Sequence, residues 1–295
     1  MCAAGIPLIF GEVLFDCFPD GREVLGGAPF NVAWNLQAMG LSPMLVSRVG
    51  DDALGSRIRE TFRFWGLDSK GLQTDPLHPT GRVKIELTDG EPQFTILADQ
   101  AYDHITKKDI GLQGNPAFLY HGSLALRNET SRATLSFLKQ EYQCHVFVDV
   151  NLRAPWWNGE DVIAIIEDAT WLKLNDNELD ALFPGPGTLE ERCRNLVDRF
   201  GLEAIFVTLG GKGAAALHRD NIFSSAKPRD DVSIVDTVGA GDAFASVLLL
   251  GLVQNWPQDS TIQRAQDFAS EIVGQRGAIT QDKMFYEPFR TKWNL

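Results

Sequence analysis

The chain has 295 residues, with 44% hydrophobic and 22% charged side chains, an ordinary globular composition that excludes a disordered or fibrous protein. Its 27 basic and 39 acidic residues give a net charge of −12. This charge repels nucleic acid and anionic lipid, so we expect neither as a partner. The four cysteines are scattered and form no CxxC pair, which argues against a disulfide framework or a cysteine zinc site.

The sequence also gives an expectation about location. No apolar run reaches the roughly 18 residues that a membrane-spanning helix needs. The apolar stretch at the N-terminus has no basic residues before it and meets carboxylates at Glu12 and Asp16. It therefore resembles a first strand more than a signal peptide, and we expect a cytoplasmic protein.

Strand-length and helix-length segments alternate along the chain. Ile6–Phe15 is predicted as a buried strand, followed by a helix that Pro29 opens and Gly40 closes. Met44–Val49 is the next strand, and a helix to about Trp65 follows it. The later predicted strands are Phe118–Ser123, Val146–Val150, Trp171–Leu174 and Ala204–Leu209. The later predicted helices are Glu129–Tyr142, Asp161–Ala169, Glu178–Phe183, Leu189–Phe200, Asp242–Leu252 and Thr261–Arg276. This alternation predicts an α/β fold: a doubly wound, mostly parallel sheet with helices on both faces.

One segment departs from the alternation. Gly81–Thr88 and Gln93–Ala98 alternate apolar and polar residues around Asp89-Gly90, which predicts a β-hairpin. A hairpin has no place in a parallel βα series, so we expect it to project as a small flap. No repeat or Pro/Ser-rich linker occurs, and the pattern favours a single domain over residues 1–295.

The most informative glycine cluster is Asp236-Thr237-Val238-Gly239-Ala240-Gly241-Asp242, which precedes an apolar helix. Small residues at a helix start let backbone N–H groups converge on an anion, and the helix dipole adds to the attraction. A carboxylate beside that anion is repulsive unless it accepts a proton. The pattern therefore fits transfer of a phosphoryl group to a hydroxyl, with Asp242 as general base. The alternative is a tight turn followed by an aspartate that caps the helix.

Other catalytic motifs are absent. The glycines at 239 and 241 do not form a GxGxxG fingerprint, which argues against a nicotinamide oxidoreductase. No GxxxxGK[ST] or GxSxG sequence occurs, and the histidines show no HExxH or ligand-like spacing.

Two further glycine clusters are candidate binding loops. Gly26-Gly27-Ala28-Pro29-Phe30-Asn31 begins the first helix, and Asp16, at the end of the predicted first strand, would lie near it. A carboxylate and an amide there could bind sugar hydroxyls, although a lone Asn often bonds only to its own helix start. The third cluster, Thr208–Gly213, follows a strand and is either a plain turn or a loop that contacts a nucleotide.

Together these stretches resemble the ribokinase-like (PfkB) family of carbohydrate kinases. The Gly26–Ala33 and Asp236–Asp242 segments match that family's two signatures, in the expected order. The resemblance implies a doubly wound α/β fold with a small β-sheet lid, here formed by residues 17–26 and 81–102. It also implies ATP and Mg²⁺ as cofactors, with K⁺ as in some members.

The resemblance also implies roles for individual residues. Asp242 is the expected catalytic base, and the amides of Gly239, Ala240 and Gly241 are expected to surround the transferred phosphoryl group. Asp16, Gly27 and Asn31 are expected to bind the sugar. The residues expected around the nucleotide are Asn175, Thr208, Gly210, Gly213, Ala269 and Gly277.

Two carboxylates are implied as metal residues. Glu178, in Asn175-Asp176-Asn177-Glu178, resembles the family's NxxE glutamate that organises Mg²⁺ through water, and a polar helix start is the alternative. Asp236 is implied as a residue that helps to hold a monovalent cation.

Asp149-Val150-Asn151-Leu152-Arg153, followed by Trp156-Trp157, resembles the fructokinase and 2-keto-3-deoxygluconate kinase branches. Arg153 is expected to reach a substrate oxygen or a phosphate, a surface ion pair being the alternative. The expected reaction is phosphorylation of fructose, a related ketose or a sugar acid by ATP. A nucleoside kinase and a non-catalytic sensor of sugar or nucleotide are the alternatives. We also expect a homodimer formed through the lid.

Overall fold

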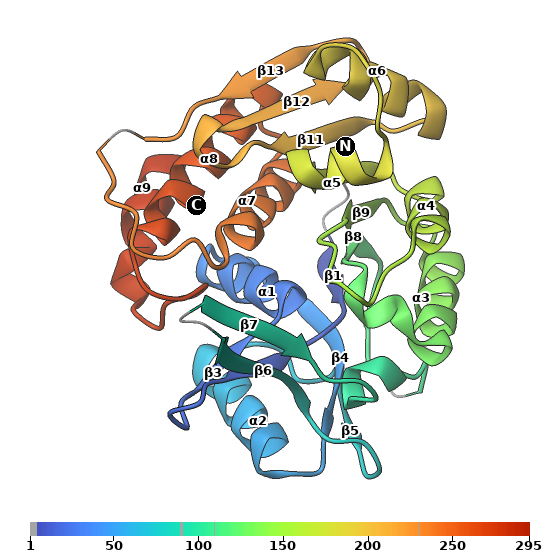
Figure 1. Ribbon diagram of the computed structural model, residues 1–295, viewed down its shortest axis with the longest axis vertical. Coiled ribbons are helices and arrows are strands. Elements are labelled where there is room, and N and C mark those ends of the chain that lie inside the picture. Colours follow the sequence, from blue (N-terminus) through green and yellow to red (C-terminus); the bar gives the residue numbers. More distant parts are fainter. Residues whose placement is uncertain (1–4, 89–90, 109, 230) are drawn as a thin grey trace.

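The computed structural model describes residues 5–88, 91–108, 110–229 and 231–295, and a nine-stranded sheet forms the centre of this part of the chain (Figure 1). Its strands run in the order β13-β12-β11-β10-β9-β8-β1-β4-β5. All neighbours from β11 to β5 are parallel, whereas β12 and β13 are antiparallel additions at one edge. The strands are β1 (Ile6–Phe10), β4 (Met44–Gly50), β5 (Leu72–Asp75), β8 (Pro116–His121), β9 (Val146–Asp149), β10 (Trp171–Asn175), β11 (Ala204–Thr208), β12 (Ala214–His218) and β13 (Phe223–Ala226).

Helices cover both faces of this sheet, which confirms the doubly wound α/β prediction. One face is packed by α1 (Ala28–Ala38), α2 (Ala53–Trp65), α7 (Ala240–Gln254), α8 (Gln258–Val273) and α9 (Glu287–Trp293). The other face is packed by α3 (Glu129–Tyr142), α4 (Gly159–Glu167), α5 (Asp176–Leu182) and α6 (Leu189–Phe200). Helix α7 is apolar on every side and almost wholly buried, as expected for a helix enclosed by its neighbours.

A second, four-stranded sheet lies beside the first, in the order β3-β2-β6-β7 (Figure 1). Its strands are β2 (Leu14–Cys17), β3 (Glu23–Gly26), β6 (Gly81–Thr88) and β7 (Glu91–Ile96). The predicted hairpin is therefore correct: β6 and β7 pair antiparallel, outside the main sheet. Its predicted turn, Asp89-Gly90, lies outside the described residues.

The predicted strand Ile6–Phe15 is wrong in its length. The chain leaves the main sheet after Phe10, and Leu14–Cys17 belongs to the small sheet. Gly11 separates the two at φ +145°, where a β-carbon would overlap the ring of Pro29 at the start of α1. Hydrophobicity alone could not show this break, because the residues on both sides of it are buried. Asp16 consequently lies in the small sheet and not at the end of β1.

Several other elements differ from the prediction. Strands β5, β12 and β13 and helix α9 were not predicted, and β8 ends at His121 instead of Ser123. Strand β3 lies within residues 17–26, which the family resemblance places in the lid, whereas β2 begins before them. Helix α8 runs from Gln258 to Val273, so it begins and ends earlier than expected. Short 3₁₀ turns, also not predicted, are η1 (Ala101–His104), η2 (Leu124–Arg127), η3 (Gly210–Lys212) and η4 (Lys283–Phe285).

The parallel strands bring several loops to one edge of the main sheet. The carboxyl ends of β9, β10 and β11 lie on this edge, where a doubly wound sheet generally binds its ligands. Helices α1 and α7 pack against each other, which brings together two segments far apart in the sequence.

Candidate active site

The two signature segments meet at one hydrogen bond. The Asn31 side-chain Nδ2, in the first turn of α1, donates to Oδ2 of Asp242, in the first turn of α7, over 2.7 Å. The Asn31 side chain therefore does not simply bond to its own helix start. Its Oδ1 is buried and has no hydrogen-bond partner among the described residues, so it can accept a bond from a ligand.

The start of α7 presents backbone N–H groups. No hydrogen bond to the N–H of Gly239 or Gly241 occurs within the described residues, while Ala240 donates a long bond of 3.3 Å to the Thr237 carbonyl. Gly239 has φ +81°, and a β-carbon there would lie 2.4 Å from Cα of Ala278. Only glycine fits this position, and free N–H groups at a helix start attract anions.

The surroundings of Asp242 disfavour its charge. Burial raises the pKa of Asp242, the hydrogen bond from Asn31 lowers it, and the nearby carboxylate of Asp149 raises it again. The net effect is a raised pKa of Asp242. A carboxylate with a raised pKa accepts a proton from an alcohol more readily than one in water does.

Lys173 and Asp149 form a buried ion pair beside this helix start. Lys173 Nζ lies 2.8 and 2.9 Å from the two carboxylate oxygens of Asp149, and the Tyr120 hydroxyl donates to the same carboxylate over 3.2 Å. A β-carbon built on Gly241 would lie 3.4 Å from Lys173 Nζ, so the ammonium group lies against the first turn of α7. Burial alone would lower the pKa of Lys173, but Asp149 raises it and the lysine stays charged.

The sequence motifs do not include Lys173. The signal available was a lysine within a buried strand, Trp171–Asn175, where a charge needs a partner. The partner, Asp149, ends the neighbouring strand β9.

A second group of carboxylates is affected by the charge of Arg153. Burial raises the pKa of Glu12 to about 7 and that of Asp16 to about 6, and the Arg153 guanidinium lowers both. The same guanidinium also lowers the pKa of Asp242, so its positive charge acts on all three acids. Arg153 is exposed and forms no ion pair with any described residue, which argues against the surface ion-pair alternative.

The small sheet places Asp16 toward these residues. Asp16, Val83 and Ile96 are neighbours on one face of that sheet. Val83 and Ile96 pack with Tyr102, Leu124 and Trp156, and Trp156 lies in the segment that follows Arg153. Gly27 immediately precedes α1, and a β-carbon built on it would lie 2.7 Å from the Glu12 carbonyl oxygen. Gly27 therefore lies next to the backbone of Glu12.

Glu178 has a structural partner at each carboxylate oxygen. Its Oε1 accepts from Leu152 N–H and its Oε2 from Asn175 N–H, both over 2.8 Å, while the Asn175 side chain accepts from Glu178 N–H. This is a capping box at the start of α5, the polar helix start that was the alternative reading. The carboxylate also fixes the segment that leads to Arg153.

The remaining predicted residues lie before α7, within and after α8, and at and after the end of β11. Asp236 accepts from the N–H groups of Val238 and Gly277, each over 3.0 Å, so it ties the α7 entry loop to the segment after α8. Thr208 ends β11, Gly210 begins the turn η3, Gly213 follows that turn, and Ala269 is buried in α8. The structure gives their places, and their contacts with a nucleotide stay predictions.

The base of the small sheet is held by Arg127. Its guanidinium donates to both carboxylate oxygens of Asp103, over 2.6 and 2.7 Å, and to the carbonyl of Leu97 over 2.7 Å. It lies 4.3 Å from the Trp156 ring, whose Nε1 donates to the Ile96 carbonyl over 3.2 Å. The small sheet is therefore anchored to the segment that carries Arg153.

N–H groups without partners among the described residues at the start of α7, an adjacent carboxylate and a neighbouring small sheet fit one class of protein: an enzyme that transfers a phosphoryl group to an alcohol. Residues 18–284 match the model of the pfkB family carbohydrate kinases. The chain belongs to this family, as its two signatures predicted, and it is a carbohydrate kinase, a phosphotransferase with an alcohol group as acceptor.

Individual relatives agree with this assignment. A fructokinase of Klebsiella pneumoniae is 31% identical over 298 residues, which cover 96% of each chain. The crystal structure of a fructokinase from Vibrio cholerae O395 with fructose, ADP and calcium ion has a TM-score of 0.80 at 28% identity and covers 96% of this chain and 98% of its own. A double mutant of that enzyme with fructose, ADP and potassium ion has a TM-score of 0.81 at 26% identity, covering 97% and 99%. Among the described residues, no helix is long and apolar enough to cross a membrane.

Proposed function

We propose that this carbohydrate kinase transfers the γ-phosphoryl group of ATP to a hydroxymethyl group of fructose or a closely related ketose, with Asp242 as general base. The observation that carries the proposal is the 2.7 Å hydrogen bond between Asn31 and Asp242. It joins a residue suited to bind sugar hydroxyls to the carboxylate at the anion site. The fructose bound in the similar Vibrio cholerae enzyme supports the choice of sugar.

The proposed proton transfer follows from the hydrogen bonding of Asp242. Asn31 occupies Oδ2, which orients the carboxylate and leaves Oδ1 to accept the proton of the attacking hydroxyl. The raised pKa of Asp242 favours that transfer as the new O–P bond forms. The N–H groups of Gly239 and Gly241 would bind the phosphoryl oxygens, and the Lys173 ammonium beside them adds positive charge.

Mg²⁺ fits this set of residues through Glu178. Each Glu178 oxygen accepts one backbone hydrogen bond, which leaves lone pairs for a metal-bound water but little room for direct ligation. When bound, Mg²⁺ would neutralise phosphate charge. A role for Asp236 near a monovalent cation stays a prediction, supported by the potassium ion in the similar double mutant.

We further propose that the small sheet acts as a lid over the sugar and excludes water, which limits hydrolysis of ATP. Phe94, 59% exposed, and Val24, 39% exposed, are apolar and lie on the same face of the sheet as Asp16. The exposed Phe94 and Val24 side chains also support the predicted homodimer through the lid. A cytoplasmic location, where ATP is abundant, stays a prediction.

A sugar acid is the second candidate acceptor, because Arg153 offers an exposed guanidinium without an ion-pair partner among the described residues. A guanidinium binds a carboxylate through two parallel hydrogen bonds.

A coupled assay of ADP release tests the proposal against fructose, other ketoses, 2-keto-3-deoxy sugar acids and nucleosides. We expect the highest kcat/KM with fructose or another ketohexose. A preference for a sugar acid, lost in Arg153→Gln but not in Arg132→Gln, would support the second candidate. A preference for a nucleoside, or no ADP release with any acceptor, would contradict the proposal.

A further inference from the structure

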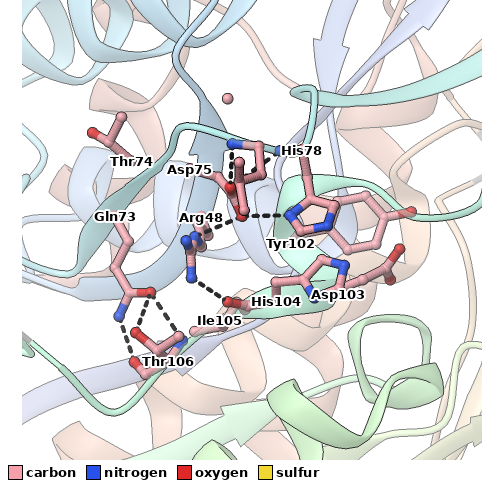
Figure 2. Close-up of polar contacts among 12 residues, drawn as sticks. Arg48, Gln73, Thr74, Asp75, His78, Tyr102, Asp103, His104, Ile105 and Thr106 are labelled. Carbon is pink, nitrogen blue, oxygen red and sulfur yellow. Dashed lines mark hydrogen bonds and ion pairs between the residues drawn. The ribbon is translucent and has the colours of Figure 1, made fainter.

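Two histidines and an aspartate converge at the base of the small sheet. His78 lies in the loop that leads into β6, while Asp99 and His104 lie in the segment that leaves β7. One nitrogen of each imidazole and a carboxylate oxygen of Asp99 all lie within 4.8 Å of one another. Figure 2 shows the two imidazole rings face to face beside Asp75 and Arg48. The kinase reaction uses none of these side chains.

The distances between these atoms suit one small cation. Asp99 Oδ1 lies 2.7 Å from His104 Nε2 and 3.6 Å from His78 Nε2. In a tetrahedral zinc site, bonds of about 2.0–2.1 Å place neighbouring ligand atoms about 3.3 Å apart. The rings are stacked with centroids 3.6 Å apart and planes 15° from parallel, so their in-plane lone pairs do not converge, and the rings have to rotate about their side-chain bonds before both nitrogens reach one ion.

His78 is already oriented as a metal ligand. Its Nδ1 lies 3.0 Å from Oδ2 of Asp75, and because a carboxylate only accepts, Nδ1 carries the proton and donates it. In the neutral ring with its proton on Nδ1, the Nε2 nitrogen carries a lone pair, and this nitrogen lies 3.6 Å from Asp99 Oδ1. A carboxylate bonded to the far nitrogen of a histidine is the usual support of a zinc-binding imidazole.

Asp75 is itself held firmly. Its side chain is wholly buried, pairs with Arg48 over 2.9 Å and accepts the N–H groups of Leu77 and His78. Arg48 also donates to the backbone carbonyl of His104 over 2.7 Å. One arginine on β4 therefore fixes both segments that supply the nitrogen ligands, as the dashed lines of Figure 2 show.

Access from solvent is open. The side chains of His78 and His104 are 24% and 20% exposed, and that of Asp99 is 71% exposed. A cation can enter from solvent and keep a water molecule as a fourth ligand.

We propose that His78 Nε2, His104 Nε2 and the Asp99 carboxylate form a zinc site that joins the two chain segments at the base of the small sheet. Two imidazoles and one carboxylate are a donor set that favours Zn²⁺ over Mg²⁺ or Ca²⁺, which prefer oxygen ligands. On binding, Zn²⁺ would take the place of the proton on His104 Nε2; the single proton of the neutral ring then lies on Nδ1, so that Nε2 offers its lone pair to the ion.

We expect zinc binding to restrict movement of the small sheet. The ion would cross-link the segment that enters β6 to the segment that leaves β7, and so restrict movement of the sheet relative to the main domain. This inference does not depend on which sugar the enzyme phosphorylates.

Zinc titration tests the proposal directly. Full-length protein without an affinity tag, stripped of metal by a chelator and kept in excess Mg²⁺, is titrated with Zn²⁺ against a chromophoric chelator. We expect one tight equivalent in the wild-type protein. His104→Gln should weaken that affinity at least about 100-fold, and Asp75→Asn about 10- to 100-fold, the usual effect of losing a supporting carboxylate.

His218→Gln is the matched control. His218 Nδ1 lies 3.3 Å from an exposed Asp220 carboxylate, a similar pair without the second histidine, so this substitution should leave the tight equivalent unchanged. The double variant His78→Gln/His104→Gln should lose it entirely. A tight equivalent that survives in this double variant, or is missing from the wild type, would overturn the proposal.

Hydrogen exchange and Co²⁺ spectroscopy provide readouts besides affinity. Zn²⁺ should slow amide exchange in residues 76–80 and 97–105 of the wild type but not of the double variant. Co²⁺ in the same site should give the intense visible absorption of four-coordinate cobalt. Equal exchange with and without Zn²⁺ at full occupancy would contradict a cross-link between the two segments.

Discussion

At the scale of single residues, burial of the Glu12 carboxylate makes its ionised form unfavourable. Its side chain is 3% exposed, and Oε2 has no hydrogen-bond partner among the described residues. Burial raises its pKa from 4.5 to about 7, while Arg153 offsets part of the effect and Asp242 adds to it. An ionised Glu12 therefore destabilises the folded protein. A sugar hydroxyl bound to Glu12, or a change of charge nearby, would change the free-energy cost of that ionisation.

This raised pKa predicts a pH-dependent stability. The folded protein binds a proton at Glu12 that the unfolded chain releases between pH 4.5 and 7, so the Glu12 contribution is fully present below pH 4.5 and is lost as the pH rises through 7. The shift corresponds to about 3 kcal/mol. Urea denaturation of Glu12→Gln and wild type across this range should show the variant gaining about that much relative stability by pH 8.

Glu86→Gln is the control for that comparison, because Glu86 is 55% exposed and pairs with Lys84 on the surface. Its difference from the wild type should stay nearly constant with pH. A constant difference for Glu12→Gln as well would show that Glu12 ionises normally in the folded protein.

At the scale of elements, the structure depends on how the small sheet is attached. The Arg127 guanidinium, 7% exposed, bonds to both oxygens of Asp103, which is 2% exposed, and stacks on Trp156. These contacts link η1, η2 and the segment after β9. The sequence around Tyr102 and Asp103 gave no clue to this, because the partner Arg127 lies in a separate 3₁₀ turn.

Arg127→Ala should therefore be strongly destabilising. It leaves the buried Asp103 carboxylate without its counter-ion, a change that generally costs about 3–5 kcal/mol. Arg132→Ala is the matched control: its pair with Asp161 is 42% and 55% exposed and should contribute less than about 1 kcal/mol. Urea or thermal denaturation of the two variants measures the difference, and equal losses would contradict an anchoring role for Arg127.

At the scale of the whole molecule, the sequence predicted the architecture well where strand-length and helix-length segments alternate strictly. The helices Glu129–Tyr142 and Leu189–Phe200 were predicted to the residue, because polar caps and a left-handed residue, Gln143 or Gly201, end each of them. The sequence did not predict the antiparallel edge. Strand β12 reads AAALH, and alanine has little preference for strands.

The part of the candidate site that lies in local sequence signatures was predictable, and the rest was not. Asp242 and Asn31 lie in local signatures, which a sequence displays directly. The Lys173–Asp149 pair, the burial of Glu12 and the His78–Asp99–His104 cluster each depend on contacts between separate segments. Spacing along the chain carries no information about such contacts, so only the three-dimensional structure shows them.

The central claim is that the start of α7, joined to α1 through Asn31, carries out the proton and phosphoryl transfer. The most direct test is the kcat of Asp242→Asn, with ATP and fructose binding measured by calorimetry, beside Asp259→Asn, an aspartate in the first turn of α8. We predict that Asp242→Asn keeps both affinities within a few-fold while kcat falls at least about 100-fold, and that Asp259→Asn behaves as the wild type. A kcat for Asp242→Asn close to that of the wild type would contradict the account.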